Sequence, residues 1–216
     1  MSAEVALLAG RFAALWQRNR IPGTADHGSV AWQEIERSYA APDRHYHSLR
    51  HLAQCLAEFD AAGAATAEGW AVELALWFHD LVLEPGARDN EQRSSERFAL
   101  LASGQLAPAR IERVSGLVLA TTHRAAPADA AAQLVCDIDL SSLGAAWPEF
   151  LADSRALWDE SRSDWQGYAH GKIGFYTQLC ARPRIFMTEH FHARCEQDAR
   201  SNMERLGAML RAGERL

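Results

Sequence analysis

Lysine is nearly missing from this sequence, which contains only Lys172, while every other basic residue is an arginine. Genomic base composition accounts for such a bias; a functional interpretation is a set of bidentate phosphate clamps. The formal net charge is −6, and no long run of like charges occurs. Because a nucleic acid polymer needs a clustered basic face, the sequence argues against that partner and leaves small anionic substrates open.

Cys-x-x-Cys pairs are also missing, since the cysteines lie far apart at Cys55, Cys136, Cys180 and Cys195. Neither a zinc knuckle nor a dithiol redox motif is therefore expected, and reduced thiols suit the cytoplasm. The first residues lack an apolar run long enough for a signal peptide or a membrane span. We expect a cytoplasmic protein without a membrane partner, and a homodimer stays open.

Strand-like alternation is missing too, whereas apolar residues recur at helical spacing, first at Val5, Leu8, Phe12 and Leu15. With 216 residues, of which 48% are hydrophobic and 23% charged, the chain fits one globular domain. We predict an all-α fold, a single-domain helical bundle of about eight to ten helices. Residues 44–143 are expected to carry its functional core, with helices in 147–213 packing on that core.

A helix rich in histidine near its start is predicted from Arg44 onward. Apolar residues repeat there at helical spacing, at Leu49, Leu52, Leu56 and Phe59. His47 and His51 are expected on one face, pointing away from that apolar stripe. Both could approach a metal or a phosphate, since neutral imidazole is a common ligand of first-row divalent metals. The alternative is a pair of solvated histidines.

An adjacent histidine and aspartate, His79 and Asp80, interrupt the segment 68–83, which is otherwise apolar on almost every side. Such a segment is typical of a central, buried helix. Burial of a carboxylate is costly unless it is paired, hydrogen-bonded or metal-bound, so a cation in the interior is the simplest explanation. The alternative is structural: a histidine bonded to a carbonyl, and an aspartate that caps a neighbouring helix.

Two further acids, Asp137 and Asp139, stand among apolar residues between 134 and 140. Two positions apart on a helix, they face nearly opposite ways. One could be a metal ligand while the other caps a helix or pairs with an arginine. Periodicity does not decide between them, and both could also be surface acids.

The segments between these motifs contain other polar residues of interest. Asp89, with Gln92 three residues on, predicts a capping box for a helix that includes Glu91. The next helix begins at Pro108 and runs towards His123. This histidine could reach the site, or it could be a helix-terminal residue favoured by the macrodipole.

The order of the motifs, His, then His-Asp, then Asp, on three predicted helices, resembles the HD superfamily of metal-dependent phosphohydrolases. The chain is most similar to the small bacterial group of predicted HD phosphohydrolases, whose pattern reads here YHSLRHL, FHDLVL, DNEQRSS and DIDLSSLG. The likeness continues through residues 182–206. Residues 163–176 depart from the group, which usually has an Arg-Glu-Tyr-like segment there, so substrate contacts from that region are in doubt.

The resemblance implies a helical-bundle phosphohydrolase whose metal ligands are His51, His79, Asp80 and Asp139. Asp139 aligns better than Asp137 with the last motif of the superfamily. His47 would be the general acid, like the earlier histidine in the similar YHNxxH segment of cyclic-nucleotide phosphodiesterases, and Asp80 is counted with it as catalytic. Weaker candidates for contacts with the substrate are Arg44, Glu91 and His123.

One divalent transition metal ion, of Mn, Fe, Co, Ni or Zn, suits this mixed ligand set better than Ca²⁺ does. The expected reaction is hydrolysis of a small phosphorylated compound, a nucleotide or other phosphomonoester, by a metal-activated water. Two alternatives stay open. One is a non-catalytic metal- or ligand-binding HD domain, and the other is a di-iron HD-fold oxygenase, which needs an extra histidine ligand such as His123.

Overall fold

The fold is all-α, as predicted, in a computed structural model that describes residues 3–63, 67–127 and 129–216. Within these ranges there are ten α-helices, one 3-10 helix (η1) and no β-strand. None of the described helices is both long enough and apolar enough to cross a bilayer. The elements are α1 (Ala3–Asn19), α2 (Gly28–Tyr39), α3 (Leu49–Ala61), α4 (Gly69–Phe78), α5 (Asn90–Ala102), α6 (Pro108–Ala120), α7 (Ala130–Leu140), η1 (Ser141–Gly144), α8 (Trp147–Glu160), α9 (Trp165–Cys180) and α10 (Glu189–Arg211).

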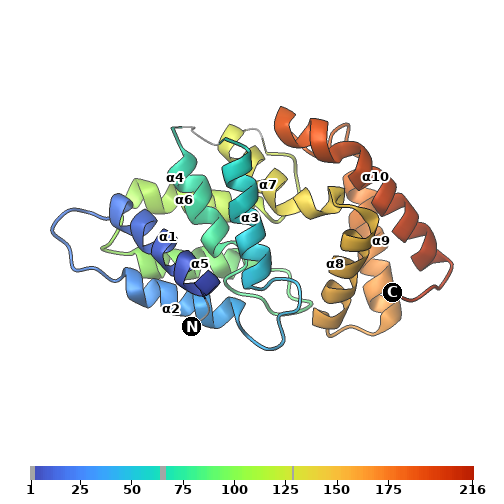
Figure 1. The fold of residues 1–216 in the computed structure, drawn as a ribbon, viewed down its shortest axis with the longest axis horizontal. Coiled ribbons are helices and arrows are strands. Elements are labelled where there is room, and N and C mark those ends of the chain that lie inside the picture. The colour runs from blue at the N-terminus through green and yellow to red at the C-terminus, as the bar shows by residue number, and fades with distance from the viewer. Residues whose placement is uncertain (1–2, 64–66, 128) are drawn as a thin grey trace.

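Helix α4 is the central element, because it packs against α1, α3, α5, α6 and α7. Nine of its ten residues are buried, as expected for a helix that is apolar on almost every side. Its one acid, Glu73, accepts a hydrogen bond of 2.6 Å from Arg11 Nε of α1. The predicted central, buried helix is therefore confirmed, and helices α1 to α7 gather around it in one part of the molecule (Figure 1).

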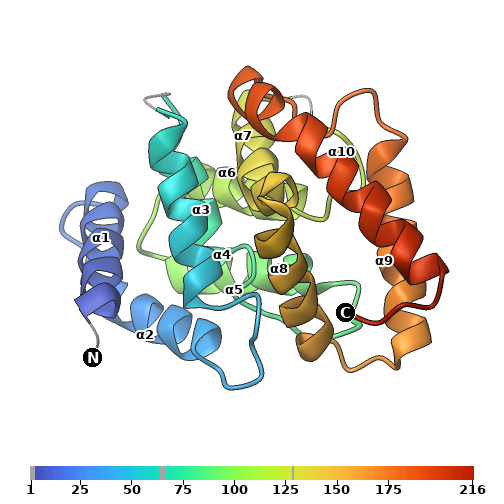
Figure 2. The same ribbon diagram turned by 45° about the vertical axis from the view of Figure 1, so that its right-hand side comes forward.

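The helices α8 to α10 lie beside this part (Figures 1 and 2). Helix α10 packs along η1 and α9. Asn202 of α10 donates hydrogen bonds to the carbonyls of Leu143 and Ala145, at 2.9 and 2.8 Å. Gly144 permits the close approach of η1 to α10, since a Cβ at that position would lie 2.8 Å from Cys195 Cα. The end of α7 is thereby fixed to the C-terminal helices.

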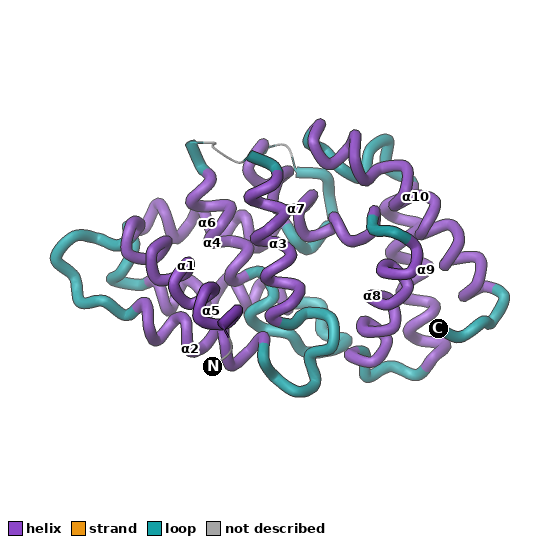
Figure 3. Tube along the Cα trace, viewed as in Figure 1, coloured by secondary structure: helices purple, strands orange, loops and turns teal. Residues whose placement is uncertain are grey.

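Two helix boundaries differ from the predictions, and both differences affect candidate residues. Helix α3 begins at Leu49 after an extended Ser48, so His47 lies in the preceding loop and not on a helical face shared with His51 (Figure 3). Helix α4 ends at Phe78, and therefore His79 and Asp80 lie at its C-terminal end and in the turn that follows. Helical periodicity does not predict the start of α3 or the end of α4, because side chains from other parts of the chain, Glu160 and Arg44, bond to the backbone of these two turns.

The predicted capping box at the start of α5 is wrong. Asp89 is the N-cap residue, but its side chain makes no capping hydrogen bond. The neighbouring Asn90 side chain instead accepts from the backbone N–H of Glu84 and donates to its carbonyl, at 2.9 and 3.1 Å. Gln92 donates to Glu96, at 2.7 Å, so it is not available for a reciprocal cap.

Gly144→Ala should lower the free energy of unfolding by about 1–3 kcal/mol, because the added methyl group overlaps the backbone of Cys195. Urea unfolding of the two proteins measures the difference. Gly116→Ala is the matched control, since a Cβ there has no neighbouring heavy atom within 4 Å. In the middle of α6 it should be neutral or stabilise by up to about 1 kcal/mol. Equal stabilities of the two variants would contradict the close packing of η1 on α10.

Candidate metal centre

Two histidines and two aspartates from α3, α4 and α7 meet in one cluster. His51 Nε2 lies 3.7 Å from Asp80 Oδ2 and 3.5 Å from Asp139 Oδ1. His79 Nε2 lies 3.1 and 3.4 Å from the same two oxygens. Ligand atoms held at about 2.1 Å from a tetrahedral ion are about 3.4 Å apart, so these separations suit a single metal ion.

Two atoms of the cluster are buried without a hydrogen-bond partner. His79 Nδ1 lies 2.9 Å from the carbonyl of Leu76 and must donate to it, which leaves Nε2 directed at the two carboxylates. His79 Nε2 and Asp80 Oδ2 form no hydrogen bond with the described residues. Buried polar atoms without partners are costly, and a bound cation would satisfy both. The residues present therefore fit a divalent metal ion.

The electrostatics of the cluster also favour an added positive charge. Burial acts to lower the pKa of His51, but Cys55 and the hydrogen bond to Asp139 outweigh it and raise the pKa to about 10. Burial likewise opposes the charge of His79, yet Asp80 holds its pKa well above the ordinary value. In the absence of a metal, the carboxylates thus hold protons on buried histidines. A divalent cation would supply that charge instead.

The two aspartates respond to the same interactions. Burial acts to raise the pKa of Asp80, but the charges of His79 and His47 outweigh it and lower the pKa. Burial opposes ionisation of Asp139 too, while the hydrogen bond from His123 and the close imidazoles of His51 and His79 hold its pKa well below the usual range. Both carboxylates are therefore in the ionised form that a metal ligand requires.

The turn that carries Asp80 is held by two residues that precede α3. The Asp80 N–H donates to the hydroxyl of Tyr39, at 3.2 Å. The Arg44 guanidinium donates to the carbonyls of Asp80, Leu81 and His47, at 2.6, 3.0 and 3.1 Å. The carbonyls of Asp80 and Leu81 lie in the segment after α4, so Arg44 fixes the turn that follows the helix.

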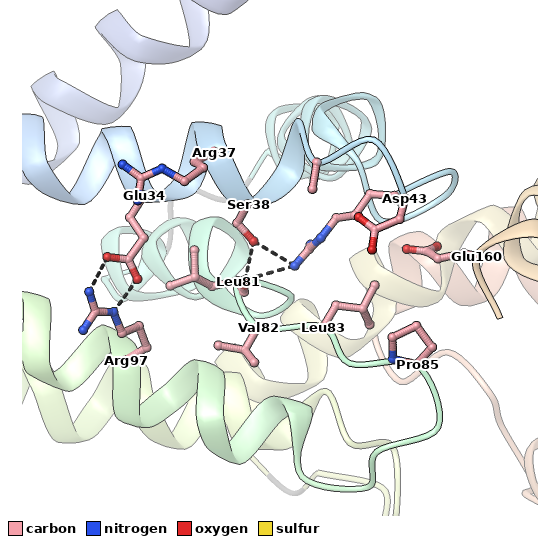
Figure 4. A pocket seen from close by; sticks show the side chains of 12 residues that line it. Glu34, Arg37, Ser38, Asp43, Leu81, Val82, Leu83, Pro85, Arg97 and Glu160 are labelled. Carbon is pink, nitrogen blue, oxygen red and sulfur yellow. Dashed lines mark hydrogen bonds and ion pairs between the residues drawn. The ribbon is translucent and has the colours of Figure 1, made fainter. Parts of the chain in front are cut away.

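Arg44, a weak candidate for substrate contact, does not reach the cluster. It lines a neighbouring cavity of about 430 Å³, together with Ser38, Glu160 and the Glu34–Arg97 ion pair (Figure 4). Its donors are directed at the chain itself, including the hydroxyl of Ser38 at 2.8 Å. The geometry gives Arg44 a structural role, and nothing in it indicates a phosphate clamp.

Asp137 and Asp139, which the sequence could not separate, have different partners. Asp139 Oδ2 accepts a hydrogen bond of 2.8 Å from His123 Nε2, while Oδ1 faces the cluster. Asp137 is buried and accepts from the N–H groups of Met187 and Thr188, at 2.9 and 2.7 Å, and from the Thr188 hydroxyl, at 2.6 Å. Asp137 therefore fixes the start of α10, and Asp139 belongs to the cluster.

His123 lies beyond the end of α6, in a left-handed conformation with φ of 52°. Its carbonyl accepts from the Arg182 guanidinium and, at 3.4 Å, from Gln178 Nε2. His123 therefore does not end helix α6, which was the alternative role for this residue. Its side chain orients Asp139, and the hydrogen bonds to its carbonyl hold it in a backbone conformation that non-glycine residues rarely adopt.

Glu160 holds His47 beside the cluster, a contact that no motif in the sequence indicates. Glu160 Oε2 accepts from His47 Nδ1, at 3.0 Å, and from the N–H groups of Tyr46 and His47, both at 3.2 Å. Burial acts to raise the pKa of Glu160, but these hydrogen bonds outweigh it and lower the pKa. His47 Nε2 is left free, 3.9 Å from Asp80 Oδ2.

A cavity of about 200 Å³ opens over the cluster. His47, Asp80, His123 and Asp139 line it, and Glu91 reaches its wall from α5. The C-terminal helices contribute three further residues, which the motifs did not indicate: Leu157 of α8, and Lys172 and Phe175 of α9. The only signal for Lys172 in the sequence is that it is the single lysine.

Cys55 is another neighbour of the cluster that the motifs did not indicate. Its Sγ lies 3.6 Å from His51 Nε2, and with His51 and His79 it forms a second group of atoms close enough to hold an ion. The group with two aspartates is the better candidate, because its two ionised carboxylates balance the charge of a divalent ion.

No family model matches this chain, and no curated protein matches it. The likeness carried by the motifs therefore stays a prediction, and the candidate site rests on its own geometry.

Asp139→Asn should abolish stoichiometric binding of a divalent transition metal, because it removes one of the two charges that face the ion. Asp137→Asn should keep the metal and lower Tm by roughly 3–8 °C, since it weakens buried hydrogen bonds to the start of α10. Metal analysis and thermal unfolding of both variants test this contrast. Cys55→Ala should also keep the metal. Metal loss in Asp137→Asn or Cys55→Ala, with retention in Asp139→Asn, would refute the assignment.

Proposed function

We propose that the protein is a metal-dependent phosphohydrolase that acts on a small phosphorylated compound, a nucleotide or other phosphomonoester, in the cytoplasm. The observation that carries the proposal is the pair of buried, unpartnered atoms His79 Nε2 and Asp80 Oδ2, in a cluster of two histidines and two aspartates under a cavity. The order of the motifs, which resembles the HD superfamily, supports it independently.

One divalent transition metal ion, when bound, would polarise a phosphate oxygen and lower the pKa of a coordinated water. The chain supplies the ligands: Asp80 and Asp139 bring negative charge, and His51 and His79 bring nitrogen donors. This mixture favours Mn, Fe, Co, Ni or Zn over Ca²⁺, which prefers oxygen ligands alone. His123 keeps Asp139 oriented through the hydrogen bond to Oδ2.

His47 is the proposed proton donor to the leaving oxygen. Its Nδ1 is hydrogen-bonded to Glu160, so the proton that it can transfer is on Nε2. Nε2 lies 3.9 Å from Asp80 Oδ2, and both residues line the cavity. Glu160 acts as a positioning residue, because its carboxylate fixes both the ring and the backbone of His47. General acid catalysis of this kind typically contributes roughly 10²- to 10⁴-fold in rate.

A di-iron oxygenase is the second candidate, and one contact favours it. His123 Nε2 lies 2.8 Å from Asp139 Oδ2, the carboxylate oxygen that faces away from the cluster. A second ion, when bound, would take His123 and Asp139 among its ligands. Two irons per chain would support this candidate, whereas one ion per chain supports the phosphohydrolase. A non-catalytic metal-binding domain would keep the ion and hydrolyse nothing.

Purified protein should contain about one transition metal ion per chain and release phosphate from at least one nucleotide or small phosphomonoester in a screen. Asp80→Ala should lose both properties, because it removes a ligand whose Oδ2 is buried without a hydrogen-bond partner. Asp198→Ala, an exposed acid on α10, is the control and should keep both. Wild-type protein without metal, or Asp80→Ala with metal and activity, would refute the proposal.

His47→Ala should retain the metal and lose roughly 10²- to 10⁴-fold in kcat, as expected for removal of a general acid. Glu160→Gln should give a smaller loss in kcat at unchanged metal content, because His47 remains but is held less firmly. His170→Ala, an exposed histidine of α9, is the control. Loss of metal in His47→Ala would instead make His47 a ligand.

A further inference from the structure

Lys172 brings a positive charge to the cavity from a part of the chain that holds no metal ligand. It lies in α9, whereas the four cluster residues come from α3, from α7 and from the end of α4. Yet Lys172 lines the same small cavity as His47, Asp80 and Asp139. Its position is on the wall that α8 and α9 contribute, next to Leu157 and Phe175.

The ammonium group of Lys172 has no anion of the protein as its partner. In the part of the chain that the structure describes, Lys172 forms no ion pair, and Asp153, the acid whose charge acts on it, is bonded to Arg50 at 2.7 Å. Burial lowers the pKa of Lys172 to about 8, while Asp153 acts in the opposite direction. The nearby ring of Tyr176, with its centroid 5.5 Å from Nζ, provides only a weak contact. Lys172 is partly buried, and a cation that loses water contacts without gaining a partner is costly, so a bound anion would stabilise it.

The other polar groups on the cavity wall are less suited to bind an anion. The hydroxyl of Thr121 donates to the carbonyl of Val118, at 2.7 Å, and Ser142 Oγ shares a hydrogen bond of 2.7 Å with the hydroxyl of Tyr46. Glu91 carries a negative charge. Lys172 is thus the only lysine or arginine among the residues that line the cavity, whose other nitrogen bases are the imidazoles of His47 and His123.

We propose that Lys172 is the phosphate-binding residue of this site, and that its substrates are terminal phosphomonoesters. The proposal rests on the phosphohydrolase function proposed above. A terminal phosphomonoester has three free phosphate oxygens, so one can approach the cluster while another approaches Lys172, which lines the same cavity. A diester has two free oxygens and a second organic group, for which a cavity of about 200 Å³ has little room.

The size of the cavity indicates how such a substrate would be bound. At about 200 Å³ it is smaller than the roughly 300–1,000 Å³ of typical small-molecule pockets. The phosphate and a few further atoms fill it, and the rest of the substrate extends through the opening. Leu157 and Phe175 offer apolar contact on the same wall as Lys172. Recognition therefore depends on the phosphate more than on the organic group.

Binding of inorganic phosphate to the full-length, manganese-loaded protein tests the proposal by calorimetry, without any need for turnover. Lys172→Met keeps the aliphatic stem and removes the charge, and it should weaken phosphate binding at least ten-fold at unchanged manganese content. Lys172→Arg should restore most of the affinity. A cyclic nucleotide, which is a diester, should compete at least ten-fold more weakly than phosphate does, and equal competition would refute the monoester class.

Two controls separate a binding role from a structural one. Arg155→Met removes a positive charge from the exposed side of α8 and should leave phosphate binding unchanged. The Tm of Lys172→Met without phosphate should be equal to or above that of the wild type, because a partly buried cation without an ion-pair partner has been removed. A clear fall in that Tm would identify Lys172 as a structural residue and refute the proposal.

The outcomes distinguish this proposal from the proposed function. Phosphate binding that depends on Lys172, in a protein that hydrolyses no phosphate ester, would refute the phosphohydrolase and keep the binding site. Hydrolysis with the same phosphate affinity and the same KM in Lys172→Met would refute the role of Lys172 and keep the phosphohydrolase. Absence of phosphate binding to the wild-type protein would also refute the role of Lys172.

Discussion

The attraction between two partly buried carboxylates and two buried imidazoles is the interaction on which the candidate site depends. His51 comes from α3 and Asp139 from α7, while His79 and Asp80 are adjacent at the end of α4. The imidazole nitrogens lie 3.1 to 3.7 Å from the carboxylate oxygens. Helix α4 is apolar almost throughout apart from Glu73, which is paired with Arg11, so the other polar groups gather where the helix ends. The cluster lies at that end, and the packing of α3 and α7 on α4 brings the other two ligands to it.

The arginines of this protein serve mainly to hold the protein together. Arg44 satisfies the carbonyls that follow α4, and Arg182 donates to the carbonyl of His123. Arg113 pairs with Glu68 and Asp129, and Arg200 donates to the carbonyls of Cys180 and Arg182. No arginine lines this cavity, so the many arginines do not form phosphate clamps there. The planar guanidinium suits such multiple bonds to carbonyls and carboxylates.

The sequence predicts the fold class and the cluster well, because both depend on local patterns. Apolar spacing reveals the helices, and the His-Asp pair in an apolar segment reveals a buried charge that needs a partner. The choice between Asp137 and Asp139 was open because it depends on Thr188, which lies 51 residues further along the chain. Glu160 and Lys172 were missed for the same reason: their roles arise only when α8 and α9 pack beside the end of α7, and no local pattern encodes that packing.

The single lysine has a chemical consequence. Apart from the α-amino group, Lys172 is the only primary amine of the chain. Because burial lowers its pKa to about 8, more of it is in the neutral, nucleophilic form near neutral pH than in an ordinary lysine. An amine-reactive reagent therefore meets one side chain, and that side chain lines the cavity over the cluster. The protein thus carries a built-in position for a single covalent label, attached where a ligand in the cavity would shield it.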